Sequence, residues 1–203
     1  DREGTRRLLA ALFAEEITPE FLDGIYRETE GNPFFVEEVC KALVEDGSLS
    51  FVAGRWDRPG MDRIDVPQSV RLAIQSRVGH LSEQVRHVLH MAAILGREFS
   101  VDLLLEAMRR AGTGEEAVVE ALETAARAQL VEEVRGTRDL FFAFAHALVA
   151  TTLVEEVPTL RRRRLHRHAA EAVERLHPGD DQALAHHYAA AGDDERALTY
   201  SRR

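Results

Sequence analysis

Cysteine is nearly absent from this sequence of 203 residues, and Cys40 is its only example. A single cysteine excludes an internal disulfide, and the apolar neighbours of Cys40 predict a small buried side chain without chemistry of its own. Long apolar runs are also missing, since no run reaches the roughly 18 residues that a membrane helix needs. The N-terminus lacks the apolar core of a signal peptide. We therefore expect a soluble, cytoplasmic protein that makes no membrane contact.

Lysine is almost missing too, because Lys41 is the only lysine among 26 basic residues. The phosphate-binding loop Gly-x-x-x-x-Gly-Lys-Ser/Thr occurs nowhere in the sequence. The chain by itself is therefore not expected to hold a nucleoside triphosphate in a P-loop. No acidic strand suited to magnesium and no nucleophile beside a base is recognisable, so we expect no catalysis from this chain alone.

The charge balance is acidic, with 35 acidic and 26 basic residues and a formal net charge of −9. A negative surface repels nucleic acid and anionic lipid, although local basic patches can still attract either one. The length suffices for one large domain or for two to three small ones, and an apolar content of 45% can form packed cores. The expected fold is mainly α, built in several pieces.

Residues 1–66 are predicted to form a three-helix domain with a small β-hairpin. Thr18 and Pro19 are typical of a helix start, and residues 49–56 alternate as a short hairpin does. We expect Trp56 to pack on its own hairpin rather than to bind a ligand. The helices are marked by apolar residues at helical spacing, namely Leu8, Leu9, Leu12, Phe13, Phe21, Leu22, Ile25, Tyr26, Phe35, Val36, Val39, Leu43 and Val44.

A corner between two helices is predicted at Gly31-Asn32-Pro33. Gly31 can end one helix by adopting a positive φ, and the side chain of Asn32 can cap the next helix. Pro33 suits the first helical position, because the N–H that proline lacks is not needed there. From these residues alone, the corner is a rigid helix junction.

Residues 67–157 are predicted to form a winged-helix domain, after a boundary where Pro59, Gly60 and Pro67 interrupt the chain. Apolar residues at helical spacing indicate helices up to about residue 127. The apolar runs 130–134 and 140–144 then flank the turn 135–138, so they predict a hairpin. This order, helices followed by a hairpin, is typical of a winged helix.

The last helix before that hairpin is acidic, which argues against DNA recognition. Its predicted exposed positions include Glu115, Glu116, Glu120 and Glu123, with Arg127 the only cation. Phosphate contacts supply most of the non-specific affinity for DNA, and here the charge has the wrong sign. We therefore expect this domain to pack against protein.

Residues 158–203 are predicted to begin a series of helical hairpins. Residues 184–200 resemble part of a tetratricopeptide (TPR) repeat, in which helix pairs stack through small and aromatic residues. The run Arg161–Arg164 is expected on a solvated or interdomain face. His166 and His168, two residues apart, fall on different faces of a helix, and the adjacent pair His186 and His187 does the same. On this reasoning no metal site is expected.

Four stretches of the sequence stand out in order: 29–38 (TEGNPFFVEE), 66–70 (VPQSV), 95–99 (LGREF) and 144–149 (FAHALV). Together they resemble the later half of a STAND-type signalling ATPase, an AAA-type class that includes bacterial ATPases joined to LuxR-type regulators or to adenylate cyclase domains. In that class a P-loop core precedes a helical lid, a winged helix and repeat helices. The resemblance implies that this chain contains the regulatory parts without the core.

The resemblance also implies nucleotide contacts. Gly31, Asn32 and Pro33 match the Gly-x-Pro motif of the lid, whose proline lies against adenine. His146 matches the histidine of the Met-His-Asp motif, which contacts the β-phosphate of ADP, although Ala145 and Ala147 replace its neighbours. ATP or ADP, with Mg²⁺, would be held by the P-loop domain of the intact parent, and the partners would be that domain and the downstream repeat or sensor region.

Three other functions remain open from the residues themselves. A winged helix that binds DNA would show salt-dependent binding to a duplex. A repeat scaffold that binds a peptide without any nucleotide is indicated by residues 184–200. An independent enzyme would use Glu37, Glu38 and the histidines as acids and bases, yet helical spacing already explains all of them.

Overall fold

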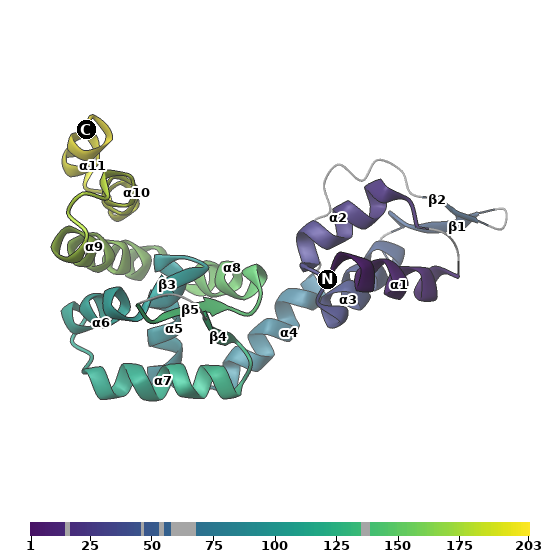
Figure 1. The fold of residues 1–203 in the computed structure, drawn as a ribbon, viewed down its shortest axis with the longest axis horizontal. Helices are drawn as coiled ribbons and strands as arrows, with labels where there is room; N and C mark the ends of the chain where they lie inside the picture. The colour runs from purple at the N-terminus through teal and green to yellow at the C-terminus, as the bar shows by residue number, and fades with distance from the viewer. Residues whose placement is uncertain (15–16, 46, 53–54, 58–67, 135–138) are drawn as a thin grey trace. The chain divides into compact units, whose positions relative to one another are not determined.

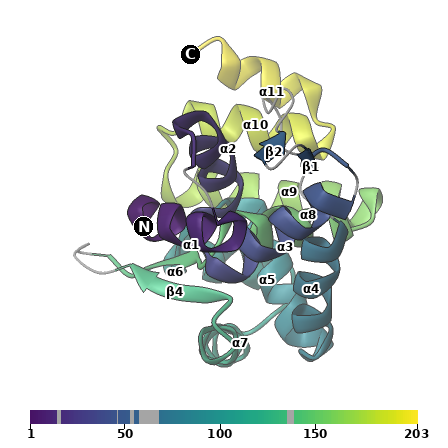
Figure 2. The same cartoon turned by 90° about the vertical axis from the view of Figure 1, so that its right-hand side faces the viewer.

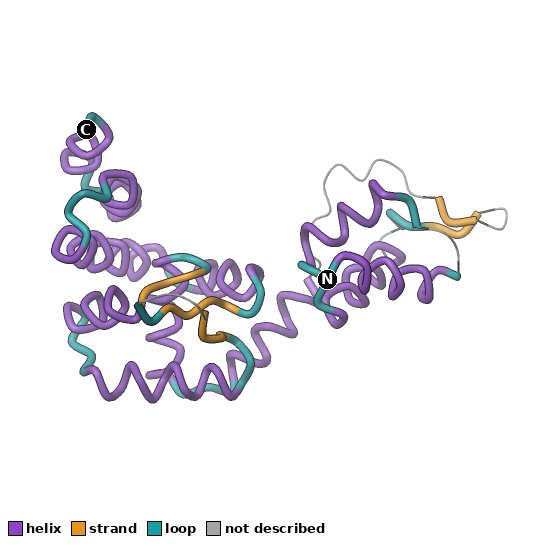
Figure 3. Tube along the Cα trace, viewed as in Figure 1, coloured by secondary structure: helices purple, strands orange, loops and turns teal. Residues whose placement is uncertain are grey.

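The computed structural model describes residues 1–14, 17–45, 47–52, 55–57, 68–134 and 139–203. Within these ranges the protein has eleven helices, a two-stranded hairpin and a three-stranded antiparallel sheet (Figure 3). This confirms the prediction of a mainly α fold. None of the helices in the described ranges has the length and apolar character required to span a membrane.

The chain divides into two compact units, unit 1 (Asp1–Ser76) and unit 2 (Arg77–Arg203). The division falls within helix α4 (Gln68–Gly79). The boundary expected at residues 66 and 67 lies outside the described residues, as do Pro59 and Gly60. Residues 67–157 and 158–203 were expected to be separate domains. Unit 2 includes the first of them from residue 77 onwards and the whole of the second.

Unit 1 contains the three short helices that the apolar spacing predicts, followed by a hairpin (Figure 1). Asp1 and Thr18 cap the first two helices through their side chains, and Pro19 stands at the first position of the second. Leu12 and Val44 are exposed rather than buried. The elements are α1 (Arg2–Phe13), α2 (Pro19–Thr29), α3 (Pro33–Glu45), β1 (Ser50–Val52) and β2 (Arg55–Asp57).

The packing of Trp56 in unit 1 agrees with the expectation that it packs on its own hairpin. Its ring lies edge-on against Phe51 of the same hairpin, with centroids 5.4 Å apart, and against Phe13 of α1 at 4.9 Å. The indole N–H donates to the carbonyl oxygen of Phe13 at 3.2 Å. Trp56 therefore anchors its hairpin to α1.

Unit 2 is built around a sheet with the strand order β3-β5-β4, all antiparallel. Strands β4 (Val131–Val134) and β5 (Phe141–Phe144) are the predicted hairpin, and the turn at 135–138 lies outside the described residues. Strand β3 (Glu98–Ser100) was not anticipated, because its three residues show no pattern of their own and no short turn joins them to their partner strand β5. It brings the buried ring of Phe99 to 5.7 Å from that of Phe144.

Helices cover this sheet and continue beyond it to the C-terminus. Ser82 and Ser100 cap α5 and α6 through their side chains, which confirms the predicted start at Ser82. Helix α8, whose first turn directly follows β5, was not anticipated from the sequence. The helices are α5 (Glu83–Leu95), α6 (Val101–Arg110), α7 (Glu115–Arg127), α8 (Ala147–Glu156), α9 (Thr159–Leu176), α10 (Asp181–Ala191) and α11 (Asp194–Ser201).

The last three helices lie one beyond another, from α9 near the sheet to α11 at the C-terminus (Figures 1 and 2). Ion pairs join α9 to α6: Glu106 lies 3.3 Å from Arg175, and Arg110 lies 3.1 Å from Glu171. Alanine, aliphatic and aromatic side chains fill the core between α9, α10 and α11, namely Ala170, Val173, Leu184, Tyr188 and Ala197.

Candidate functional site

The corner at Gly31-Asn32-Pro33 has the geometry that the sequence predicts, with one addition. Glu30, and not only Gly31, adopts a left-handed conformation, with φ of 50° and 74° respectively. The N–H of Glu30 donates to the carbonyl of Tyr26 at 2.7 Å, which ends α2. The side chain of Asn32 then accepts the N–H of Phe34 at 3.1 Å, and α3 begins at Pro33.

Glycine is required at position 31 for two reasons. A positive φ of 74° strains any residue that carries a Cβ. A Cβ at this position would also lie 2.8 Å from Thr5 Oγ1 and 2.9 Å from a ring carbon of Tyr26. The corner is therefore pressed against α1, and its direction is fixed by contacts within unit 1.

Pro33 and Phe34 are two exposed apolar side chains at the start of α3. Phe34 has 46% of its surface exposed, whereas its neighbour Phe35 is buried at 3%. The rings of the two phenylalanines meet edge-on at 5.6 Å. Pro33 is also exposed, so a rigid ring and a flat aromatic side chain are available on the surface of unit 1.

His146 belongs to unit 2 and caps α8. Its side chain is buried, with 2% exposed, and Nδ1 accepts the N–H of Leu148 at 3.1 Å. An Nδ1 that accepts is unprotonated, so the neutral ring carries its hydrogen on Nε2. A phosphate contact by His146 would have to use Nε2. The structure thus groups Gly31, Asn32 and Pro33, and places His146 in the other unit.

The charged surfaces of unit 2 agree with the expectations for α7 and α9. Glu115, Glu116, Glu120 and Glu123 of α7 are all exposed, so this helix presents an acidic face. In the run Arg161–Arg164, three arginines are exposed and Arg162 is half-buried. The run is therefore a largely solvated face, as expected.

A cluster of three histidines, which we call the histidine cluster, lies between α9 and α10. It consists of His166, His186 and His187, and each residue offers a ring nitrogen within 4.8 Å of the others. Nδ1 of His166 is 3.0 Å from Nδ1 of His187. His187 is buried, His166 is half-buried and His186 is exposed. The ring centroids are 5.1 to 5.8 Å apart.

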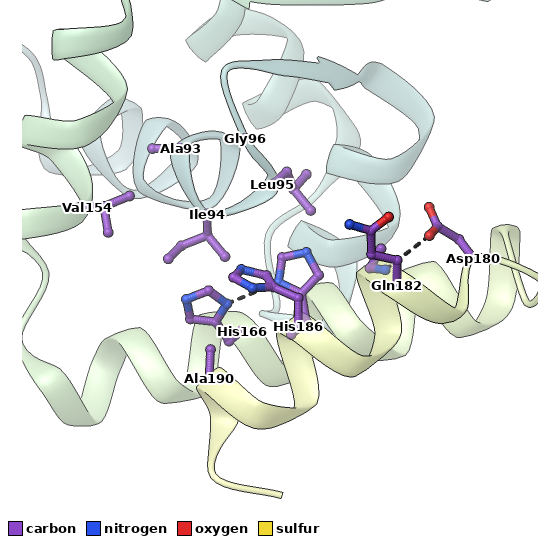
Figure 4. A pocket seen from close by; sticks show the side chains of 12 residues that line it. Ala93, Ile94, Leu95, Gly96, Val154, His166, Asp180, Gln182, His186 and Ala190 are labelled. Carbon is purple, nitrogen blue, oxygen red and sulfur yellow. Dashed lines mark hydrogen bonds between the residues drawn. The ribbon is translucent and has the colours of Figure 1, made fainter. Parts of the chain in front are cut away.

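The histidine cluster lines a pocket of about 600 Å³ within unit 2. The apolar wall comes from the end of α5 and includes Ile94 and Leu95, while Asp180 and Gln182 lie at the start of α10 (Figure 4). Burial, followed by the charges of His186 and Arg162, lowers the pKa of His166 to about 4. Burial, followed by His166 and His186, likewise lowers the pKa of His187 to about 4. Both rings are therefore neutral at pH 7.

Sequence reasoning missed this cluster because it tested histidine pairs only within one helix. His166 and His168 do point differently: Nδ1 of His168 has no hydrogen-bond partner among the described residues, whereas His166 meets His187. The cluster instead forms across two helices that pack against each other. The available signal was the adjacent pair His186 and His187, since one of two neighbouring histidines on a packed helix faces the preceding helix.

Comparison with known proteins identifies one distant relative and no family. No protein-family model matches the chain. The uncharacterized protein R02095 of Rhizobium meliloti (strain 1021) is 25% identical over 208 residues, which cover 98% of this chain and 19% of that protein. The chain therefore spans about a fifth of the length of this curated relative.

Proposed function

We propose that this chain is the regulatory portion of an ATP- or ADP-dependent signalling switch, in which a P-loop domain outside the chain holds the nucleotide. The observation that carries the proposal is the corner at Gly31-Asn32-Pro33. It has a fixed direction and leaves Pro33 exposed at the start of α3. An exposed proline ring on a rigid corner suits contact with the flat face of a purine, because it has no N–H to leave unpaired.

In this proposal, the first part of unit 2 is a winged helix. The support is the succession of α5, α6 and α7, followed by the antiparallel pair β4 and β5, with β3 completing the sheet beside β5. That order is the order of a winged helix. The exposed acidic face of α7 makes a phosphate backbone an unfavourable partner, so the proposed role is contact with protein.

The proposed route from the winged helix to an effector is the series α9, α10 and α11. Ion pairs connect α6 to α9, and a shared core connects α9 to the next two helices. Stacked helix pairs of the TPR type transmit contacts only between neighbours, which suits a relay. A movement of α6 would therefore reach α11 through packed side chains.

His146 is the second proposed nucleotide contact, and its capping role constrains how it acts. A hydrogen bond from Nε2 to the β-phosphate of ADP would add about 1.5 to 3 kcal/mol when charge-assisted. Nearly complete closure of a two-state switch takes roughly 5.5 kcal/mol, so His146 would act together with Pro33 and with domain contacts. Because the ring is buried in the present conformation, the contact requires the surroundings of α8 to open.

The test is ADP affinity measured by calorimetry on the intact parent protein. Pro33→Ala should weaken ADP binding several-fold, since it removes about 1 kcal/mol of apolar contact. The matched control is Pro19→Ala, which changes an exposed proline at the same position of α2. His146→Asn retains a side chain that can cap α8, and it should weaken ADP binding about 10-fold or more. Unchanged ADP affinity in both variants would refute the proposal.

A second candidate function is a protein-binding scaffold without nucleotide contact. It is favoured by a groove on α10 and α11, where the exposed side chain of Leu198 lies beside Ala189 and Ala197. In that case Leu198→Asp would abolish partner binding, whereas Pro33→Ala and His146→Asn would leave regulation of the parent unaltered. Salt-dependent binding of a DNA duplex by the chain would instead support a third role, DNA recognition.

A further inference from the structure

We propose that the histidine cluster of His166, His186 and His187 binds one divalent transition-metal ion, and that zinc suits its ligands best. This site is independent of the proposed nucleotide contacts, since all three histidines lie in α9 and α10. Imidazole nitrogen is a preferred ligand of zinc, copper and nickel, whereas magnesium and calcium prefer oxygen. Three histidines on two adjoining helices therefore point to a zinc-like ion.

The distances within the cluster are close to those of a tetrahedral site. Zinc–nitrogen bonds of about 2.0 to 2.1 Å place two ligand nitrogens roughly 3.3 Å apart. The Nδ1 atoms of His166 and His187 are 3.0 Å apart, and no pair of offered nitrogens is more than 4.8 Å apart. To bind an ion, the Nδ1 atoms of His166 and His187 would move slightly apart. The exposed ring of His186 would turn toward the ion.

A hydrogen bond between two histidines explains only part of this arrangement. It accounts for His166 and His187, because one Nδ1 can donate while the other accepts. It does not explain why His186 also lies within reach, with its ring centroid 5.8 Å from that of His166. A metal ion uses all three rings at once.

The surroundings of the cluster suit both ligand chemistry and access. A metal binds unprotonated imidazole, and the burial of His187 and the half-burial of His166 favour the uncharged ring. The pocket beside the cluster leaves room for water as a fourth ligand (Figure 4). Three protein ligands and one water is the composition of an open zinc site.

A bound ion would join two helices of unit 2, beside a third. His166 belongs to α9, His186 and His187 belong to α10, and the end of α5 forms the facing wall of the pocket. The ion would therefore hold α10 against α9 and stabilise the folded form in proportion to its occupancy. The metal would control the stiffness of the C-terminal helices.

The experiment uses the 203-residue chain, freed of metal with a chelator and titrated with Zn²⁺, with Co²⁺ as a spectroscopic substitute. We expect one Zn²⁺ per chain with micromolar or tighter affinity, a raised melting temperature, and the visible absorption of four-coordinate Co²⁺. His166→Gln and His187→Gln should each weaken Zn²⁺ binding at least 10-fold. The control is His168→Gln, which changes a half-buried histidine outside the cluster on the same helix and should leave binding unchanged.

Two safeguards keep the test decisive. Melting curves without metal show whether each variant folds, and the Co²⁺ spectrum of the unaltered chain needs no variant at all. Absence of saturable Zn²⁺ binding by the unaltered chain overturns the proposal. Equal loss of binding in His168→Gln and His166→Gln overturns it as well, because it would place the ion elsewhere.

Discussion

The ring of Tyr188 stacks on the ring of Tyr200, with centroids 5.8 Å apart and planes inclined by 6°. Both hydroxyl groups donate to Glu174, at 2.8 Å from Tyr188 and 2.6 Å from Tyr200. The guanidinium of Arg196 donates to the hydroxyl oxygen of Tyr188 at 3.0 Å and lies over its ring. One carboxylate of α9 is thus connected to both α10 and α11.

The first prediction concerns that carboxylate. Glu174→Ala removes the acceptor of two tyrosine hydroxyls, one of them on the fully buried Tyr188. We expect the free energy of unfolding of unit 2 to fall by about 2 kcal/mol, as measured by urea titration with circular dichroism. Glu120→Ala on the exposed face of α7 is the control and should change it by less than about 0.5 kcal/mol. Equal effects of the two substitutions would contradict the role given to Glu174.

The second prediction concerns the glycine of the corner. Gly31→Ala should destabilise unit 1 by more than about 2 kcal/mol, because it adds backbone strain and a clash with Thr5 and Tyr26. Gly47→Ala is the matched control: φ is 80° there, but no other described atom lies within 4 Å of an added Cβ. It should cost only about 1 kcal/mol. Thermal unfolding of the two variants measures the difference, and equal melting temperatures would refute the close packing at Gly31.

The third prediction concerns a buried polar ring in α5. Both ring nitrogens of His90 are buried without a hydrogen-bond partner among the described residues, and a carboxylate oxygen of Glu156 lies 3.9 Å from Nε2. His90→Leu removes these unpaired groups and keeps an apolar side chain of similar size. We expect a gain of about 1 kcal/mol in unfolding free energy at pH 7. His80→Leu, an exposed histidine, is the control. A lower unfolding free energy in His90→Leu than in the unaltered chain would contradict this prediction.

The fourth prediction is that stability falls as the solution is acidified from about pH 6.5 to pH 4. Burial, as the main cause, lowers the pKa of His90, His166 and His187 to about 4 each. In that window the unfolded chain binds protons that the folded chain does not, so protonation favours unfolding. The total loss should be roughly 2 to 4 kcal/mol, since these rings are partly solvated and two of them interact.

The acid titration also contains a contribution from Glu106, most of which lies at lower pH. Hydrogen bonds from Arg109, and to a smaller extent from Arg110, lower the pKa of this carboxyl from 4.5 to about 2, so its contribution begins to fade near pH 5 and is lost mostly below pH 4. Urea unfolding is measured with a chelator present, at intervals from pH 7 to pH 4. It gives the slope of the unfolding free energy against pH. His90→Leu should make the slope shallower. A flat profile would contradict the neutral state of the three rings.

The helices of this protein could be predicted well from local patterns. Apolar spacing located α1, α2 and α3, and capping residues such as Thr18 and Ser82 marked helix starts where the structure has them. These features depend on residues three or four positions apart, so they act before any tertiary contact forms. The acidic face of α7 followed from the same spacing.

Strand β3, helix α8 and the histidine cluster were not predictable in this way. Strand β3 has three residues and exists because its backbone pairs with β5, more than 40 positions away. Helix α8 begins at a histidine cap, and histidine is not among the usual capping residues. Within the candidate site, neighbouring residues were enough to predict the corner at Gly31-Asn32-Pro33. Its contact with a nucleotide stays a prediction.

The mainly helical character, the helix starts and the presence of a corner at Pro33 follow from local sequence, because each depends on backbone preferences and on neighbours within one turn. Tertiary packing alone brings His166 to His187 and joins Tyr188 to Tyr200 through Glu174. Those meetings depend on how α9, α10 and α11 rotate about their axes as they pack. That rotation is set by burial of the whole apolar face, which no single stretch of sequence specifies.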